Sequence, residues 1–488
     1  MSEAPPEGYN TPIPPQITTP DRVDTRLGSL VFDDGRPSPE TVDQLYDFLD
    51  LMRGVQVFLD GVPAASLEAM RAGLSDHGID GCHHVLIADE LLDSAPLFLT
   101  GNTDTVYAAG LVDLERDGPT VVEIPPGCGP GTVNDAWFRF VVDMGAPGPD
   151  RGQGGKYLLV HADDERELPD GYFVARSPSY VNWLILRGFL VDGRPDAATA
   201  MFRQGLRVYP LSRAEAPPEM VFSSFSGTAM NTIHANDVTF YDELARVIQR
   251  EPVGLIDAET RGVLASIGIH KHRPFEPDER MCDLLAEAVR IGNGTARALA
   301  MAPRSADVRI YDDRRWQTGF LGGDYEWMGR DPLNGRDHDA RTMFFYFATV
   351  NTPAMALEMV GVGSQYAIAF RDAADEYLDG GAHYRLRIPA DVPAKDFWSV
   401  VVYDPQTRSE LQTGQPFPSR NDQRDELVVG DDGAVELWFG PDVPPGGSES
   451  NWIQTVPGKG WFAILRLYGP LASWFDRSWR PGDIERLT

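Results

Sequence analysis

The pattern of apolar and polar positions predicts two β-rich regions with helices between them. Short runs rich in β-branched and aromatic residues, bounded by Gly, Pro and Asp clusters, recur from residue 105 to 190 and again from 384 to 468. Such runs are typical of buried antiparallel strands. Between the two regions, apolar residues recur three or four positions apart, as in amphipathic helices. We therefore expect an α+β protein, mainly β with a helical insert, in which a helical region joins two antiparallel β-sandwich or jelly-roll-like domains.

The same pattern places the domain boundaries. Residues 1–37 are rich in Pro, Thr and Asp and predict an irregular arm. An N-terminal helix and the first sandwich are expected over 38–196, a mainly helical connecting region over 197–365, and the second sandwich over 366–488. The expected strands are Thr105–Leu114, Thr120–Ile124, Trp137–Val142, Tyr157–Val160 and Val181–Leu190 in the first sandwich, and Tyr384–Ile388, Trp398–Tyr403, Glu426–Val429, Ala434–Phe439 and Trp461–Tyr468 in the second.

Two helices are predicted ahead of the first strands. Ser38-Pro39-Glu40 places a capping side chain before a Pro at the first helical position. The apolar residues from Val42 to Val55 keep one helical face. We expect this helix to end near Leu59 and a second, shorter one to span Ser66–Leu74.

Two nine-residue stretches, Asp135–Asp143 and Asp396–Asp404, share a pattern. In each, a Trp follows the first Asp by two positions and a second Asp follows it by eight. We interpret both as strands of two copied β-domains that face each other and enclose a cavity. Strand alternation would then put Trp137 and Arg139 on one face, opposite a wholly apolar one.

Composition narrows the classes of partner. The 488 residues include 73 acidic and 43 basic side chains, a net charge of −30, which repels phosphate backbones and anionic lipid heads. We therefore expect a small-molecule ligand or substrate and neither nucleic acid nor membrane as partner, with a homo-oligomer left open. The three cysteines form no CxxC pair, and the N-terminus has no leader-like segment, so a reduced, cytoplasmic protein is expected.

Several motifs are found together in a known family. The first group is Gly101-Asn102-Thr103-Asp104-Thr105-Val106-Tyr107, Gly118-Pro119 and Gly154-Gly155-Lys156-Tyr157; the second is Phe397-Trp398-Ser399, Tyr403-Asp404, Thr407-Arg408-Ser409, Asp432-Gly433, Asn451-Trp452 and Arg466-Leu467-Tyr468-Gly469-Pro470. At these residues the chain resembles bacterial two-domain proteins that carry domain of unknown function 1254 followed by domain of unknown function 1214. The resemblance implies two β-sandwich-like domains joined by a helical region, and little chemistry. Many relatives look exported.

Two arginines stand inside apolar strand patterns. Arg139 and Arg466 each need a carboxylate, a carbonyl or a ligand anion, because burying an unpaired guanidinium costs several kcal/mol. An internal salt bridge is one interpretation for each arginine, and a substrate-binding arginine is the other. In the second interpretation Trp137 lies beside Arg139 on the ligand side.

Asn102, Asp104 and Tyr107 are the candidate catalytic residues. They lie where a loop becomes a strand, and Asn102 and Asp104, two positions apart, would point the same way. An amide and a carboxylate that converge can orient a substrate hydroxyl, act as a base through water, or bind a cation. The alternative is an Asx turn that bonds its own backbone.

Further substrate-binding candidates come from loops. Glu449, Asn451 and Trp452 lie in a Gly-Ser-rich loop, where Trp could stack on a ligand or simply cover the core. Arg341 could bind substrate or form a structural ion pair, and the same alternatives apply to Arg408 and Arg420.

Cofactor motifs are missing from the sequence. There is no Gly-x-Ser-x-Gly, P-loop or Gly-x-Gly-x-x-Gly motif, so no cofactor is predicted. A divalent cation near Asp104, or at His270 and His272, is the alternative, although no third ligand has a recognised spacing. We expect a cofactor-independent small-molecule enzyme, such as a hydrolase, with its pocket between or at the mouth of the sandwiches. A carbohydrate- or metabolite-binding protein, or a structural subunit of an oligomer, is the alternative.

Overall fold

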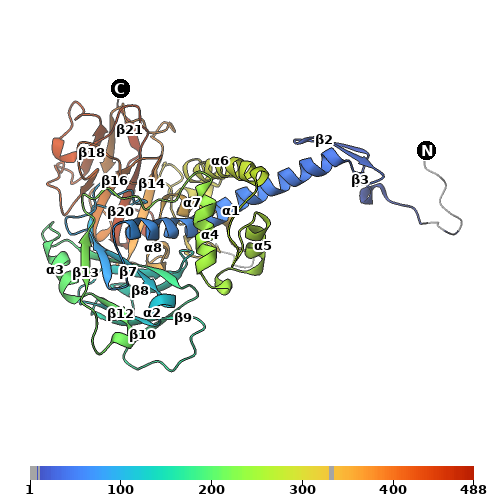
Figure 1. Ribbon diagram of the computed structural model, residues 1–488. Helices are drawn as coiled ribbons and strands as arrows, with labels where there is room; N and C mark the ends of the chain where they lie inside the picture. The colour runs from blue at the N-terminus through green and yellow to red at the C-terminus, as the bar shows by residue number, and fades with distance from the viewer. Residues whose placement is uncertain (1–7, 9–10, 329–334, 488) are drawn as a thin grey trace.

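The computed structural model describes residues 8, 11–328 and 335–487 and has two β-sandwiches with helices between and beside them (Figure 1). The mixed α+β fold predicted from the sequence is confirmed. In Figure 1 the second sandwich lies above the first, and most of the helices lie to one side. The helices are α1 (Pro39–Asp76), α2 (Leu114–Asp117), α3 (Asp196–Gly205), α4 (Thr239–Arg250), α5 (Ala258–Ser266), α6 (Glu279–Met301), α7 (His338–Phe347), α8 (Pro353–Ala356) and α9 (Ala472–Phe475).

The first sandwich packs a six-stranded sheet, ordered β13-β4-β5-β11-β7-β8, against a four-stranded sheet, ordered β10-β9-β6-β12. β12 and β13 follow α3, so the strands of this sandwich continue beyond the boundary expected at residue 196. Its strands are β4 (His84–Ile87), β5 (Thr105–Asp113), β6 (Thr120–Ile124), β7 (Pro130–Asn134), β8 (Phe140–Gly145), β9 (Gly155–His161), β10 (Phe173–Ser177), β11 (Val181–Phe189), β12 (Arg207–Pro210) and β13 (Val221–Ser224).

The second sandwich packs two four-stranded sheets, ordered β14-β20-β16-β17 and β19-β18-β15-β21. The strand expected at Glu426–Val429 is absent from this described region, where only Val429 forms an isolated bridge. Asn451 instead bonds the N–H and the C=O of Val428, which satisfies the backbone without a neighbouring strand. The strands are β14 (Ser364–Ala369), β15 (Tyr384–Ile388), β16 (Ala394–Tyr403), β17 (Ser419–Asn421), β18 (Val435–Gly440), β19 (Trp452–Gln454), β20 (Phe462–Pro470) and β21 (Ile484–Arg486).

The inner sheets of the two sandwiches face each other across a shared core. On β11, Ile185 points into this shared core and Leu186 into the first sandwich. On β20, Ile464 points into the shared core and Leu465 into the second sandwich. Side chains of α1 and α7 belong to the same core, so helices fill much of the space between the sheets.

The first 76 residues differ from the prediction in two ways. β1 (Arg22–Thr25), β2 (Gly28–Asp33) and β3 (Arg36–Pro37) form a small sheet at the projecting end of α1, so the arm is not irregular throughout (Figure 1). α1 is also one helix, although we expected two. Pro63 removes one backbone donor, but residues 61–70 are all buried in the shared core, and this packing maintains the helix.

The two stretches interpreted as copies have different structures. Asp396–Asp404 lies mostly within β16, and Trp398 packs in the core of the second sandwich. Residues 135–138 form a turn instead, in which Phe138 has a φ of 53°, and β8 begins only at Phe140. The turn breaks strand alternation, so the predicted shared face of Trp137 and Arg139 is wrong. The two sandwiches still face each other, but this pattern gives no support for a duplication.

Candidate functional site

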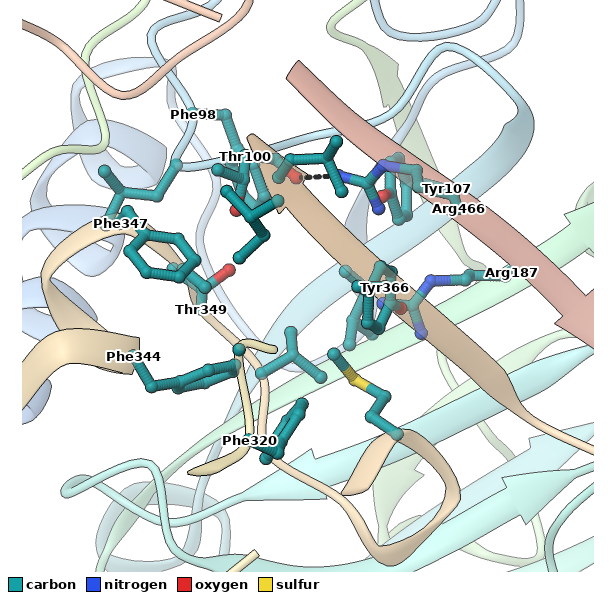
Figure 2. Close-up of a pocket in the computed structure, with 18 residues that line it drawn as sticks. Phe98, Thr100, Tyr107, Arg187, Phe320, Phe344, Phe347, Thr349, Tyr366 and Arg466 are labelled. Carbon is teal, nitrogen blue, oxygen red and sulfur yellow. Dashed lines mark hydrogen bonds between the residues drawn. The ribbon is translucent and has the colours of Figure 1, made fainter. Parts of the chain in front are cut away.

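A cavity of about 40 Å³ lies between the inner sheets of the two sandwiches (Figure 2). Figure 2 shows two arginines on one side of the cavity and phenylalanines of α7 on the other. Residues of β5, β11, β14 and β20 contribute to the wall, so both sandwiches form it. The lining residues are Phe98, Leu99, Thr100, Tyr107, Ile185, Arg187, Gly319, Phe320, Phe344, Phe347, Ala348, Thr349, Val350, Met355, Tyr366, Ile368, Ile464 and Arg466.

Arg187 provides a buried positive charge on the first-sandwich side of the cavity. It lies directly opposite Tyr107 in the β11–β5 pair, with its guanidinium carbon 5.5 Å from the centre of the phenol ring. Only 8% of Arg187 is exposed, and no carboxylate forms an ion pair with it within the described ranges. Its charge therefore lacks the partner that a buried guanidinium normally has.

Arg466 is the corresponding cation on the second-sandwich side. Its guanidinium donates to the carbonyl of Thr100 at 2.6 Å and to that of Gly101 at 3.1 Å. It also donates to the Tyr403 hydroxyl at 2.6 Å. From the sequence we considered an internal salt bridge for Arg466. In the structure its guanidinium is bonded to backbone carbonyls instead. These bonds join a loop of the first domain to the second sandwich.

Tyr107 lines the cavity and is oriented by Asn102. The Asn102 side-chain N–H donates to the Tyr107 hydroxyl at 2.5 Å and to the Tyr468 hydroxyl at 2.9 Å. Its oxygen accepts from the backbone N–H of Asp104 at 2.9 Å, which is the Asx turn considered from the sequence. Because Asn102 is the donor in both phenol contacts, each hydroxyl keeps its own proton to donate. Burial raises the pKa of Tyr107, so its phenol stays protonated.

Asp104 lies in the contact between the domains and is not part of the cavity wall. It is fully buried, and its carboxylate accepts from Ser399 at 2.5 Å and from Asn421 at 3.1 Å. Asn102 and Asp104 therefore do not converge on one spot, because the turn sends the amide towards the tyrosines and the carboxylate towards the second sandwich.

Three substrate-binding candidates do not line this cavity: Arg139, Trp137 and Arg341. Arg139 pairs with Asp135 at 2.6 Å, and Arg341 pairs with Asp60 at 2.5 Å, as the structural interpretation predicts. The Trp137 indole donates to the Asp60 carbonyl. These residues border a second, more polar cavity of about 390 Å³ beside α1 and α7.

The loop candidates of the second domain are structural. Asn451 bonds the backbone of Val428 and the carbonyl of Glu436. The Trp452 indole donates to the Gly440 carbonyl, and the backbone carbonyl of Glu449 accepts from Arg420. All of these contacts lie within the second sandwich, and Glu449, Asn451 and Trp452 do not line the cavity between the domains. Arg408 is likewise held by the carbonyls of Tyr346 and Gln406.

Sequence reasoning missed Arg187 and Tyr366. Arg187 lies in an apolar run, Val181–Leu190, just as Arg466 does in Trp461–Tyr468, so the argument used for Arg466 applied equally. Tyr366 fell in a region assigned to no strand. Its hydroxyl contacts Ser364 at 2.6 Å, and its ring lies 5.3 Å from the Arg466 guanidinium carbon.

No metal-binding group of three or more His, Cys, Asp or Glu side chains occurs within residues 11–328 and 335–487. The oxygens of Asp104 face hydrogen-bond donors from Ser399, Asn421 and Thr103.

None of the helices bounded above is both long enough and apolar enough to cross a bilayer.

The comparisons with known proteins agree with this architecture. Residues 83–210 match the family described as "Protein of unknown function (DUF1254)", and residues 363–472 match "Protein of unknown function (DUF1214)". The chain carries DUF1254 followed by DUF1214. The family resemblance expected from the sequence is thereby confirmed. Arg187 and Tyr107 belong to DUF1254, and Tyr366 and Arg466 to DUF1214, so the cavity is built by both families' domains.

One solved structure shares the fold of this chain at low sequence identity. The VPA0106 protein from Vibrio parahaemolyticus aligns over 90% of this chain and 100% of its own, with 18% sequence identity and a TM-score of 0.55. A putative uncharacterized protein from Burkholderia cenocepacia aligns over 92% of this chain and 96% of its own, with 13% identity and a TM-score of 0.39. No curated protein matches the chain.

Proposed function

We propose that this protein binds a small molecule in the cavity between its DUF1254 and DUF1214 sandwiches. The observation that carries this proposal is the wall of the cavity. Both domains contribute polar groups, Arg187 and Tyr107 from one and Arg466 and Tyr366 from the other, to a space whose remaining lining is apolar apart from two threonines. A few convergent polar groups in an apolar pocket are typical of ligand sites.

The chemistry of the wall favours binding over hydrolysis. Among the described residues that line the cavity there is no Ser, Cys, His, Asp or Glu. Thr100 and Thr349 carry hydroxyls of a nucleophilic type, but the His, Asp or Glu that most often acts as the base is missing from the described wall. Asp104, the expected base, is held by Ser399 and Asn421 inside the domain contact.

A cofactor-independent enzyme is the second candidate, and Tyr107 is the observation that favours it. Its hydroxyl is fixed by Asn102, keeps a proton to donate, and lies beside a positive charge. Such a phenol can act as a general acid. Under this candidate, Tyr107→Phe removes turnover and weakens ligand binding by much less than it slows turnover.

A thermal-shift experiment tests the binding proposal. The full-length protein is heated with a panel of short-chain acids, amides and alcohols, and compounds that raise Tm are titrated. Ala348→Leu places extra carbons in the cavity and removes the shift, whereas Ala374→Leu, at an exposed turn, retains it. A panel that gives no shift, or a shift that Ala348→Leu leaves intact, contradicts the proposal.

A further inference from the structure

The charged side chains among the described residues that line the cavity are all positive. Arg187 and Arg466 both reach it, and no acidic residue is present among its described lining residues. Within the described part of the chain neither arginine pairs with a carboxylate, in a protein that has 30 more acidic than basic side chains. Acidic side chains are thus abundant in the sequence, but none is among the described residues that line the cavity.

The two arginines differ in what holds them. The bonds of Arg466 to the carbonyls of Thr100 and Gly101 and to the Tyr403 hydroxyl all leave from Nη2, and Nε also contacts that hydroxyl, so one edge of its guanidinium is committed, while Nη1 has no hydrogen bond in the described structure. Arg187 is 92% buried, since 8% is exposed, and it has the Tyr107 phenol as a neighbour; Asp143 acts on its charge electrostatically but forms no ion pair with it. A buried guanidinium of this kind is stabilised by an anion that forms charge-assisted hydrogen bonds with it.

We infer that the ligand of this cavity is a short organic monocarboxylate, whose carboxylate is held by Arg187 and whose apolar end points towards Phe344 and Phe347. Figure 2 shows the Arg187 guanidinium and these rings on opposite sides of the space. The inference rests on the proposed function and specifies its ligand class. Tyr107, which keeps its own proton, is the second donor to the carboxylate.

The size of the cavity limits the ligand. A volume of about 40 Å³ corresponds to roughly three water-sized positions, which limits the ligand to an acid of about two or three carbons. The Arg187 guanidinium matches one carboxylate, whose two oxygens accept two parallel N–H bonds.

The test compares propionate with propionamide, which has nearly the same shape but no charge. Dissociation constants are measured for the full-length protein by ligand-observed NMR in a zwitterionic buffer of low ionic strength. Propionate is expected to bind at least tenfold more tightly than propionamide. Arg187→Met removes this preference, and Arg187→Gln provides a second neutral variant. Arg194→Met, which makes the same charge change at an exposed turn, retains the preference.

The results of these measurements distinguish two claims: that the cavity binds a ligand, and that the ligand is a monocarboxylate. If propionamide binds as tightly as propionate and Ala348→Leu abolishes both, the cavity is a ligand site but the carboxylate assignment is wrong. If inorganic phosphate binds more tightly than propionate, the assignment to a monocarboxylate is also wrong. If neither organic compound binds the unaltered protein, the carboxylate assignment fails, and the panel of the proposed function decides separately whether the cavity binds any ligand.

Discussion

Arg466 of the second sandwich donates a hydrogen bond of 2.6 Å to the backbone carbonyl of Thr100 in the first. The same guanidinium holds the Gly101 carbonyl and the Tyr403 hydroxyl. One side chain thus connects a loop of DUF1254 to two strands of DUF1214 at the edge of the cavity. The contact fixes the distance between the domains and so fixes the shape of the space between them.

Replacing Arg466 by Met should therefore destabilise the protein by about 3 kcal/mol, because buried carbonyls and a phenol lose their donor. Urea denaturation measures the change in the free energy of unfolding. Arg194→Met, at an exposed turn, should change it by less than about 0.5 kcal/mol. Equal effects of the two substitutions would mean that the Arg466 contacts contribute nothing to stability.

Arg187→Met, unlike Arg466→Met, should not destabilise the protein. Arg187 has no carboxylate partner in the described structure, so the substitution removes an unpaired buried charge and places an apolar chain beside Phe and Ile side chains. We expect the unfolding free energy in the absence of ligand to stay the same or to rise by about 1 kcal/mol. A loss as large as that of Arg466→Met would show that Arg187 has a structural partner.

Asp104 should matter for stability and not for ligand binding. Asp104→Ala leaves Ser399 and Asn421 without an acceptor and should cost about 2–4 kcal/mol. Asp104→Asn should cost less, because its oxygen still accepts from Asn421 and the Ser399 hydroxyl can reverse its role. Denaturation curves and ligand titrations on both variants check this order. A folded Asp104→Asn protein that binds ligand normally but has lost a measured turnover would restore Asp104 as a catalytic residue.

Glu410 makes stability depend on pH. It is 2% exposed, and both of its carboxyl oxygens are buried without a hydrogen-bond partner in the described structure. Burial, together with the nearby Asp104, raises the pKa of Glu410 well above its usual value. The folded state therefore keeps a proton that the unfolded chain loses above its ordinary pKa of about 4.3.

The stability contributed by this proton is present at low pH and is lost as pH rises towards the folded-state pKa. Relative to Glu410→Gln, the wild-type protein should lose up to about 1.4 kcal/mol per pH unit between pH 5 and 8. Urea denaturation at several pH values gives the difference. Glu165→Gln, which makes the same substitution at an exposed position, is the matched control. Parallel curves for wild type and Glu410→Gln would show that Glu410 ionises normally.

The two sandwiches could be predicted because their strands carry apolar runs. Four of the runs named from the sequence correspond to β5, β11, β16 and β20 in the structure. It also identified Arg466 and Tyr107 as residues of interest. It misplaced Asp104, because an Asx turn changes direction within three residues and strand alternation does not apply there. The turn at Phe138 misled the comparison of Trp137 with Trp398 for the same reason.

Other features depend on contacts that are distant in sequence. Pro63 is tolerated in α1 because that part of the helix is buried, with helices such as α4 and α6 packed against α1, and no local pattern reports such packing. The cavity brings Arg187 and Tyr366 together from segments far apart in the chain. A pattern within one strand can mark an arginine as unusual, but it cannot show which cavity the arginine faces.

The most direct test of a ligand site between the sandwiches is a crystal structure of the protein soaked with propionate. The account predicts electron density for one propionate inside the cavity, with its carboxylate within hydrogen-bonding distance of the Arg187 guanidinium and its methyl group towards Phe344 and Phe347. A cavity filled only by water or side chains, with propionate absent or bound elsewhere, would contradict it.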